Sequence, residues 1–545
     1  MKLPGTWSVA ALFTAILIPV SSFSDDGLFK ISKRYRVETR SESGLYHALT
    51  RTETWKPKAT AIIVCDVWDV HHCLNAVRRV KQLAPRINDL LTHMRQRGAF
   101  VIHAPSSCME FYKGQPGRQR ALSAPQAKNL PVDIGNWCTS IPAEEKGKYP
   151  LDQSDGGVDD DPDENQQWHA ELRAMGRDMK YGPWKRQIDI IEIHDQDAIS
   201  DNGVEVWNML EHRQIKNVLL VGVHTNMCVL GRPFGLRQMA KNGKNVVLVR
   251  DLTDTMYNPA RWPHVSHFTG TDLIVEHIEK FVCPTVTSDS ILGGAPLHFQ
   301  NDRRPHIVFV IAEDLYETKR SLPAFAAQHL GKHFRYSFVF GSETDRGDIP
   351  GLEALDDADL LVLSVRRRIL PGPQLDRFRA HLEAGKPLVA LRTSSHAFAP
   401  RHDEEVPDGR AAWREFDPEV LGGSYHGHHS NHGKGAPKTE VHVVPTASHH
   451  PIVAGMRSEK LFAPSSLYKV TPLAKTTKLL MMGRVAGDDS SPEPVAWTHL
   501  YRGARVFYTS LGHTGDFALR DFQQLLWNAI FWSLQRDAPE LAVPE

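Results

Sequence analysis

The stretch between residues 217 and 243 constrains the fold of this chain most strongly. Its first part, Val218–Val221, is a short run of apolar residues, which is typical of a strand buried in a parallel sheet. Gly222 ends the run, and Cys228 follows where a strand is expected to turn into a helix. The pattern therefore predicts a strand-turn-helix unit of an α/β domain, with a cysteine in its turn.

Cys228 is the first candidate for chemistry. A thiol at the start of a helix feels the positive end of the helix dipole, which favours the thiolate. Backbone amides at such a turn can also hold an oxyanion. Pro233 indicates that the regular helix begins near Arg232 or is kinked there. The residues alone leave a second interpretation open, a buried structural cysteine.

Length and composition place the chain among ordinary globular proteins. With 545 residues it is long enough for more than one domain. The formal net charge is zero, so nothing in the composition indicates a nucleic-acid partner. The last of the six cysteines is Cys283, so the C-terminal half has no cysteine chemistry.

The N-terminus has the features of a secretory signal. Lys2 provides a weakly positive start, and Val9–Val20 is an apolar segment of signal-peptide length. Ser22 and Ser24 suit the small positions before a cleavage site, which predicts a signal peptide over residues 1–24. We therefore expect a secreted or periplasmic protein without a membrane span after processing. The alternative is an uncleaved N-terminal anchor.

Strands and helices alternate after a polar, extended lead-in at residues 25–58. A strand at Ala59–Val64 is followed by Asp66, where open α/β sheets place ligands, and a helix cap is the alternative role of this residue. Residues 109–186 interrupt the alternation, and we expect an irregular insertion over the carboxyl edge of the sheet. The other expected elements are helices at Ala76–Arg97, Val204–His212 and Leu273–Phe281, and strands at Ala99–Ile102, Ile188–Ile193, Val218–Val221 and Val246–Val249.

Residues 58–290 resemble a known family. Asp66 after the first strand, the run G-V-H-T-N-M-C-V before a helix, and V-V-L-V-R-D-L-T-D are similar to the isochorismatase-like cysteine hydrolases. In that family a Cys attacks an amide-type carbon, an Asp is the base and a Lys assists. The resemblance implies that Cys228 is the nucleophile and Asp66 its base. It also implies a cis peptide at Val223–His224, with the amides of His224 and Cys228 as the oxyanion hole.

One departure from the family concerns its lysine. The chain has no Lys between residues 186 and 215, where the resemblance places it. Lys185, Glu192 and His194 are the candidate substitutes, and the alternative is that the hydrolase activity is altered or absent. The metal ligands of the nicotinamidase branch have no counterpart either, and the adjacent His71 and His72 lack a ligand spacing. We therefore expect neither a metal nor a cofactor.

A second α/β domain is expected after a linker at residues 284–304, which is rich in Ser, Thr, Gly, Pro and Asp. Its expected elements are strands at His306–Ile311, Tyr336–Phe340, Ala358–Leu363 and Pro387–Leu391, and helices at Leu322–His329 and Gln374–Ala384.

This second half, residues 305–537, resembles the ThuA-like (trehalose utilisation) branch of the class I glutamine amidotransferase-like fold. The motifs are G-K-P-L-V-A-L-R-T-S-S-H-A-F, L-G-G-S-Y-H-G-H-H, H-H-P-I and the run P-V-A-W-T-H-L-Y-R-G-A-R-V-F-Y-T-S-L-G-H. Where a glutaminase carries Cys, this chain carries a Ser-rich turn; a serine hydrolase is one reading of it, and a polar turn is favoured because no acid partner is evident. The candidate ligand site, which suits a sugar, comprises Ser394, His396, Tyr425, His426, His450 and His513.

The sequence therefore predicts two three-layer α/β/α domains with mainly parallel sheets, joined by a short linker: a hydrolase domain at residues 59–283 and a ThuA-like domain. The favoured function is an exported cysteine hydrolase acting on a C–N bond of a small amide-type substrate. The alternative is a non-catalytic or carbohydrate-binding exported protein. The sequence leaves the oligomeric state open.

Overall fold

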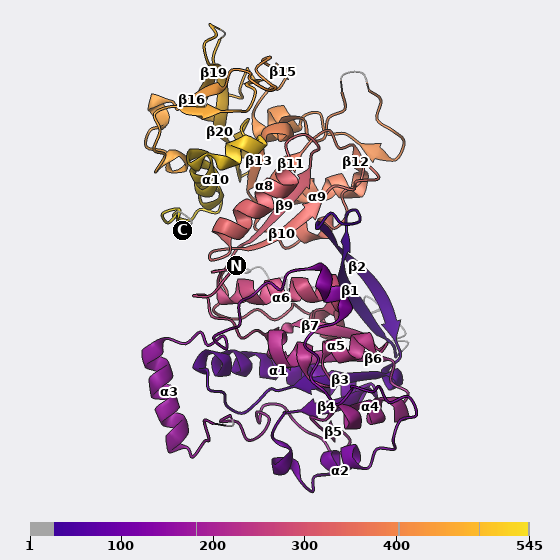
Figure 1. Ribbon diagram of the computed structural model, residues 1–545. Helices are drawn as coiled ribbons and strands as arrows, with labels where there is room; N and C mark the ends of the chain where they lie inside the picture. The colour runs from indigo at the N-terminus through magenta and orange to yellow at the C-terminus, as the bar shows by residue number, and fades with distance from the viewer. Residues whose placement is uncertain (1–26, 181, 402–403, 490, 543–545) are drawn as a thin grey trace, which may run out of the picture.

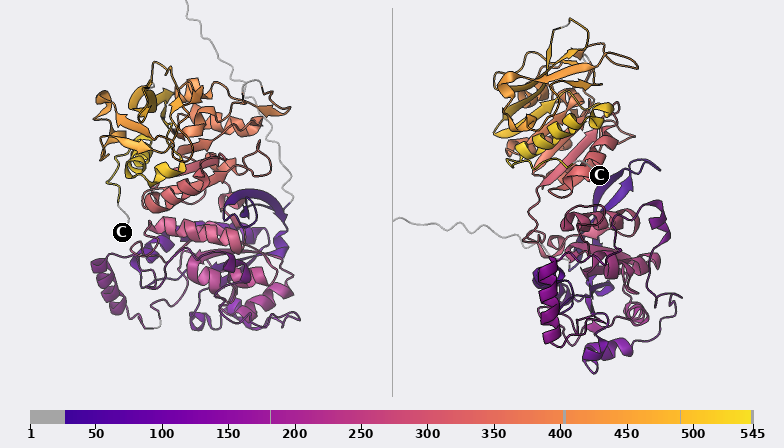
Figure 2. Two further views of the ribbon diagram at one scale, coloured as in Figure 1. Left: turned by 45° about the horizontal axis from the view of Figure 1, so that its top comes forward. Right: turned by 60° about the vertical axis from the view of Figure 1, so that its left-hand side comes forward.

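The computed structural model describes residues 27–180, 182–401, 404–489 and 491–542. It shows two α/β domains, one stacked on the other (Figures 1 and 2). Both have large, mainly parallel sheets, as predicted from the sequence. The predicted signal peptide lies outside the described residues. Within the described ranges, no helix combines the length and the apolar character that a membrane crossing requires.

The first domain is built on one eight-stranded sheet. Its strands are β1 (Phe29–Glu38), β2 (Tyr46–Trp55), β3 (Thr60–Cys65), β4 (Phe100–Ala104), β5 (Ala198–Ile199), β6 (Asn217–Val223), β7 (Asn245–Asp254) and β8 (Thr285–Val286). They lie in the order β2-β1-β8-β7-β6-β3-β4-β5. The strands from β8 to β5 are parallel, and β1 pairs antiparallel with β2 and β8.

Helices cover both faces of this sheet. They are α1 (Leu74–Gln96), α2 (Pro116–Leu122), α3 (Pro162–Ala174), α4 (Gly203–His212), α5 (Leu236–Lys241), α6 (His267–Phe281) and α7 (Asp289–Leu292). Successive residues of β3 point to opposite faces: Ile62 packs in one core with Leu90 of α1, and Ile63 in another with Leu210 of α4 and Ile274 of α6. The apolar run of β3 is continuous because both of its faces are buried.

The ThuA-like half folds around a nine-stranded sheet. Its strands are β9 (His306–Ala312), β10 (Arg335–Phe340), β11 (Leu360–Val365), β13 (Leu388–Leu391), β16 (Thr439–Val443), β17 (Leu461–Ala463), β19 (Lys478–Val485), β20 (Glu493–Tyr501) and β21 (Ala504–Thr509). They lie in the order β10-β9-β11-β13-β21-β20-β19-β16-β17, and the first five are parallel. Two small sheets pair β12 (Leu370–Pro371) with β14 (Arg410–Ala411), and β15 (Gly427–His428) with β18 (Tyr468–Lys469).

Three helices sandwich the second sheet. They are α8 (Thr318–Phe325), α9 (Gly372–Glu383) and α10 (Arg520–Ser533). Leu322 of α8 and Phe522 of α10 share one core with Phe309 of β9, whereas Phe378 of α9 lies in the core on the other face. The three-layer arrangement predicted for this half is therefore present.

The expected lead-in and the expected linker both contribute strands to the first sheet. The lead-in forms the β1–β2 hairpin, which extends the first sheet and reaches the second domain, where β2 contacts β10 (Figure 1). The expected linker begins inside the first sheet as β8, and the Ser288 hydroxyl donates to Asp251 at 2.6 Å. Some of the polar residues of these segments form ion pairs with the first domain, such as Arg34–Glu279 (2.7 Å).

The strand expected at Ile188–Ile193 is not formed. Ile188 and Ile191 are buried, while Ile190 between them is 41% exposed. A spacing of three suits a turn, and the Ile191 amide donates to the carbonyl oxygen of Ile188 at 3.2 Å. The edge strand is instead β5, which pairs with β4.

Gly222 lies at the closest approach of β3 and β6. Cys65 pairs with Gly222 in the parallel register. A Cβ at Gly222 would lie 2.0 Å from the carbonyl oxygen of Cys65, and φ at this residue is +108°. Both the space and the backbone conformation therefore require glycine.

We predict that Gly222→Ala destabilises the first domain by more than about 3 kcal/mol, because the clash with the Cys65 carbonyl adds to the cost of a positive φ. Urea denaturation followed by circular dichroism measures this. Gly98→Ala is the matched control: φ is +91° and nothing lies within 4 Å of the added Cβ, so only about 1 kcal/mol is expected. Equal effects of the two substitutions would contradict the clash.

Candidate active site

The first domain places Asp66 and Cys228 at the same edge of its sheet. Asp66 follows β3 directly, and Cys228 lies in the helical turn Thr225–Val229 after β6. Because β3 and β6 are neighbours and parallel, their carboxyl ends meet. The turn ends before Pro233 and α5 begins at Leu236, so the helix is interrupted at the proline.

The backbone before Cys228 has the form that the family resemblance implies. The Val223–His224 peptide bond is cis, as predicted. The amide of His224 hydrogen-bonds to the Cys228 sulfur and lowers the pKa of the thiol. One of the two expected oxyanion donors therefore lies beside the nucleophilic atom.

Asp66 is fully buried and held by two donors. Its Oδ1 accepts a hydrogen bond from the Ser106 amide at 2.7 Å, and its Oδ2 contacts Nε of Arg232 at 3.1 Å. Burial raises the pKa of the Asp66 carboxyl, and the Arg232 charge and the Ser106 hydrogen bonds oppose part of this rise. A base with a raised pKa is suited to accepting a proton.

The electrostatics of Cys228 differ from the expectation based on its helix terminus. Burial raises the pKa of the thiol, and the neighbouring Asp66 charge raises it further, while Arg232 lowers it. The net effect is a thiol that stays protonated at rest, because loss of water outweighs the dipole of a short turn. Asp66 is hydrogen-bonded to this thiol.

Arg232 is the residue that sequence reasoning missed. It lies one helical turn after Cys228, and its amide donates to the Cys228 carbonyl oxygen at 3.0 Å. Its guanidinium then reaches back to Asp66. The signal was the spacing of four residues, which puts two side chains on one face of a helical turn.

The three expected lysine substitutes have other contacts. Nζ of Lys185 donates to the carbonyl oxygen of Gly176 at 3.4 Å. Glu192 and His194 contact each other at 3.2 Å and are exposed. Within the described part of the chain, the salt bridge of Asp66 is made by Arg232 alone.

The irregular insertion at residues 109–186 covers the Cys228 turn, as expected. The Tyr149 hydroxyl donates to the carbonyl oxygen of Asn226 at 3.1 Å. The Trp137 ring lies 5.4 Å from the guanidinium carbon of Arg232, and the Trp184 ring stacks on Trp68 with centroids 4.1 Å apart. Aromatic rings therefore surround the site and limit the access of water.

A buried ionic network lies beside this site. Arg79 contacts Asp254 at 2.6 Å and Asp159 at 2.8 Å, and His267 contacts the same two carboxylates at 2.9 and 3.1 Å. Although burial alone would raise it, Arg79 and His267 hold the pKa of Asp254 at about 2. Burial lowers the pKa of His267, but the two carboxylates outweigh this effect and raise it to about 9.

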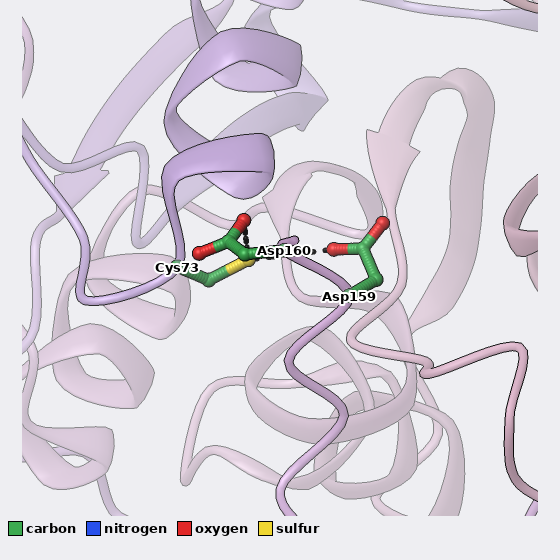
Figure 3. Close-up of side chains that lie close together, drawn as sticks. All are labelled: Cys73, Asp159 and Asp160. Atoms are coloured by element: carbon green, nitrogen blue, oxygen red, sulfur yellow. Dashed lines mark hydrogen bonds between the residues drawn. The ribbon is translucent and has the colours of Figure 1, made fainter. Parts of the chain in front are cut away.

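Cys73, Asp159 and Asp160 lie close together at the start of α1 (Figure 3). The Asp160 carboxylate accepts hydrogen bonds from the amides of Leu74 and Asn75, both at 2.7 Å, so it caps the helix. The Cys73 thiol donates to Asp160 at 3.2 Å, and burial together with the Asp159 charge raises its pKa. The Asp160 carboxylate and the Cys73 thiol thus cap the helix, and we assign no metal site to these residues.

The turn after β13 carries part of the predicted ligand site of the second domain. Ser394 is buried, and its hydroxyl donates to the carbonyl oxygen of Leu363 at 2.8 Å. The His396 ring contacts the Ser395 hydroxyl at 3.1 Å and stacks on Tyr425 with centroids 4.5 Å apart. Since the Ser394 hydroxyl points to a backbone carbonyl, the geometry favours the polar turn over a serine nucleophile.

The remaining predicted residues of this site are not all gathered at the turn. The His513 ring lies 5.5 Å from the Tyr316 ring. His426 is exposed, with Nδ1 2.9 Å from the Ser424 carbonyl oxygen. His450 packs against α10 instead, with its ring 5.7 Å from that of Trp532.

Arg392, the first residue after β13, lies between the Tyr316 and Tyr468 rings and was not singled out in the sequence. Its guanidinium carbon lies 4.3 Å from the Tyr316 ring and 4.5 Å from the Tyr468 ring. It donates to the Ser510 carbonyl oxygen at 2.7 Å and to the Ser466 hydroxyl at 2.9 Å. Its charge forms no salt bridge with any carboxylate among the described residues.

Comparison with known proteins identifies the second half. The model of the trehalose utilisation family, ThuA, matches residues 307–533. These residues form a ThuA domain. Comparison with curated proteins finds no match.

Solved structures similar to the chain include two kinds of protein. A ThuA-like protein from Bacteroides uniformis ATCC 8492 is 17% identical, with 45% of this chain and 97% of that chain covered and a TM-score of 0.33. A cysteine hydrolase from Pseudomonas syringae pv. phaseolicola 1448A is 16% identical, with 44% and 93% covered and a TM-score of 0.27. An isochorismatase family protein from Burkholderia thailandensis is 14% identical, with 43% and 94% covered and a TM-score of 0.23.

The His267 network predicts a pH-dependent stability of the first domain. The folded pKa of about 9 exceeds the unfolded value of 6.5, so its stabilisation is complete below pH 6.5 and is lost as the pH rises through 9. The difference corresponds to about 3 kcal/mol. The measurement is the free energy of unfolding between pH 6 and pH 9.5, in wild type and in His267→Gln.

The variant should lose the part of the pH dependence that wild type shows above pH 6.5. His194→Gln is the control, because His194 lies at the surface beside Glu192. Identical pH profiles for wild type and His267→Gln would contradict the assigned protonation state.

Proposed function

We propose that the first domain is a cysteine hydrolase that cleaves a C–N bond of a small amide-type substrate, and that the protein is exported. The observation that carries the proposal is the contact of one buried carboxylate, Asp66, with both the Cys228 thiol and the Arg232 guanidinium. Export rests on the N-terminal sequence.

Acylation begins with the transfer of the thiol proton from Cys228 to Asp66. The sulfur bonds to the amide carbon, and the electron pair of the C=O bond moves to the oxygen, where backbone amides of the turn stabilise the charge. When the C–N bond breaks, the proton returns from Asp66 to the leaving nitrogen. Water then attacks the thioester with Asp66 as base, which releases the acid and restores the thiol.

Arg232 supplies charge rather than a proton. Burial lowers its pKa, but Asp66 and the two nearby thiols more than offset this, so the guanidinium stays charged. Its charge favours the ionised form of Asp66, which is the form that accepts the thiol proton. The arginine therefore replaces the electrostatic part of the role that the family assigns to lysine.

We predict that Cys228→Ala and Asp66→Asn abolish hydrolysis of a panel of small amides, because they remove the nucleophile and the base. Arg232→Gln is expected to lower kcat/KM about 100-fold, while Arg232→Lys, which keeps the charge, stays within about tenfold of wild type. Release of amine, measured by a coupled assay, provides the rates.

Cys108→Ala is the matched control for the nucleophile. Cys108 is also buried, and burial with the Asp66 charge raises its pKa to about 12, yet it takes no part in the proposed reaction. Full activity of Cys228→Ala, or loss of activity in Cys108→Ala with an intact fold, would contradict the assignment.

A second candidate function is carbohydrate binding by the ThuA domain. The Tyr316–His513 and His396–Tyr425 ring pairs lie at the carboxyl edge of the sheet, where Arg392 contacts Tyr316 directly and Tyr468 lies between Arg392 and Tyr425. Aromatic faces of this kind pack against sugar rings.

Calorimetry of the full chain with disaccharides and keto-sugars tests this second candidate. The expected heat should be lost in Tyr425→Ala and His513→Ala and kept in His442→Ala, which changes a histidine of strand β16. No heat with any sugar would remove this candidate.

A further inference from the structure

A groove lies beside α10 in the ThuA domain, away from the turn after β13. It encloses a volume of about 930 Å³ and is lined by α10 and by the segments at residues 451–457 and 535–540. Four of its lining residues are arginines, namely Arg457, Arg505, Arg520 and Arg536. His450, which the sequence assigned to a ligand site, adjoins this groove next to Pro451.

The four arginines carry charges that the protein itself does not neutralise. Across the described residues, none of them forms a salt bridge. Asp537 and Glu540 also line the groove, but neither pairs with an arginine there. By contrast, Arg502, three residues before Arg505, pairs with Glu383 at 3.0 Å.

The contacts that these arginines do make are with neutral acceptors. Arg505 donates to the Trp532 carbonyl oxygen at 2.8 Å. Arg520 donates to Oε1 of Gln524 at 3.2 Å and to the Leu541 carbonyl oxygen at 2.6 Å. Nε of Arg520 is buried without a partner. The groove thus combines excess positive charge with an unsatisfied donor.

The titration of neighbouring histidines is consistent with this charge. Burial lowers the pKa of His329 to about 4, with a further contribution from Arg520. Burial also lowers the pKa of His450, and the charges of Lys478 and Arg505 lower it further. A concave surface with an excess of positive charge concentrates the potential and attracts an anion.

We propose that this groove binds a small ligand carrying a phosphate or sulfate ester, such as a phosphorylated or sulfated sugar. A guanidinium group can donate two parallel hydrogen bonds to two oxygens of a phosphate or sulfate ester. Several guanidinium groups around one cavity favour an ester of this kind over a single carboxylate. The Trp532 side chain also lines the groove and suits the sugar part. The site lies in a different domain from Cys228, so it does not depend on the proposed hydrolase.

The test is calorimetry of the full chain with glucose 6-phosphate, glucose 6-sulfate and glucose as probes. In the Tyr425→Ala variant, which removes the other candidate sugar site, we expect both esters to bind and glucose not to bind. Arg505→Gln and Arg520→Gln should each weaken ester binding about tenfold, because each removes a charged hydrogen bond. Binding should also weaken when NaCl is raised to about 0.5 M.

Matched variants separate the groove from other causes. Arg502→Gln removes an equal charge nearby and should leave the affinity unchanged, as should Tyr425→Ala at the other candidate ligand site. Arg457→Gln, at an exposed arginine, tests the groove if the more buried variants fail to fold. The proposal is overturned if neither ester binds, if glucose binds the Tyr425→Ala variant as well as the esters do, or if Arg502→Gln weakens binding as much as Arg505→Gln.

Discussion

The parallel pairing of β3 with β6 is the constraint on which the site of the first domain depends. It sets Cys65 opposite Gly222, so the residues that follow each strand emerge at one edge. Asp66 and Cys228 are 162 positions apart in the chain and are brought together only by this register. The close approach of the Cys65 carbonyl to Gly222 leaves no room for a side chain there.

Burial then decides the chemistry that this edge can perform. Removing Asp66 and Cys228 from water favours their neutral forms, and a single cation, Arg232, works against this effect. The outcome is a hydrogen-bonded pair of a carboxyl group and a thiol in which both groups have a raised pKa. Such a pair is suited to a reaction in which the proton leaves the sulfur only as the sulfur attacks.

The ThuA domain uses the same physical rules for a different purpose. Its sheet ends at a turn that holds Arg392 between two tyrosine rings, with neutral oxygens as partners. The groove beside α10 likewise leaves arginines without carboxylates. Both places thus hold guanidinium groups whose hydrogen-bond partners in the protein are neutral.

Much of this fold could be predicted because its elements have clear local patterns. The apolar run at Thr60–Cys65 is typical of a buried parallel strand, and the helical periodicity of Leu74–Gln96 can be recognised in the sequence alone. The strand expected at Ile188–Ile193 was wrong because the buried residues Ile188 and Ile191 have the spacing of a turn, which a search for apolar runs does not detect. The lead-in was predicted to be an extended segment and residues 284–304 a linker, because their polar residues gave no sign of their distant partners.

The candidate site divides in the same way. The family resemblance of the motif around Cys228 and Asp66 implied a nucleophile, a base and a cis peptide, and the structure contains the cis peptide at Val223–His224. The charge states of these groups and the contact of Arg232 with Asp66 could not be predicted from the sequence, since they depend on burial and on contacts across the sheet. The sequence by itself determined which elements form and which side chains end their strands. Only the tertiary structure decided which charges are paired, because solvation and pairing depend on three-dimensional neighbours.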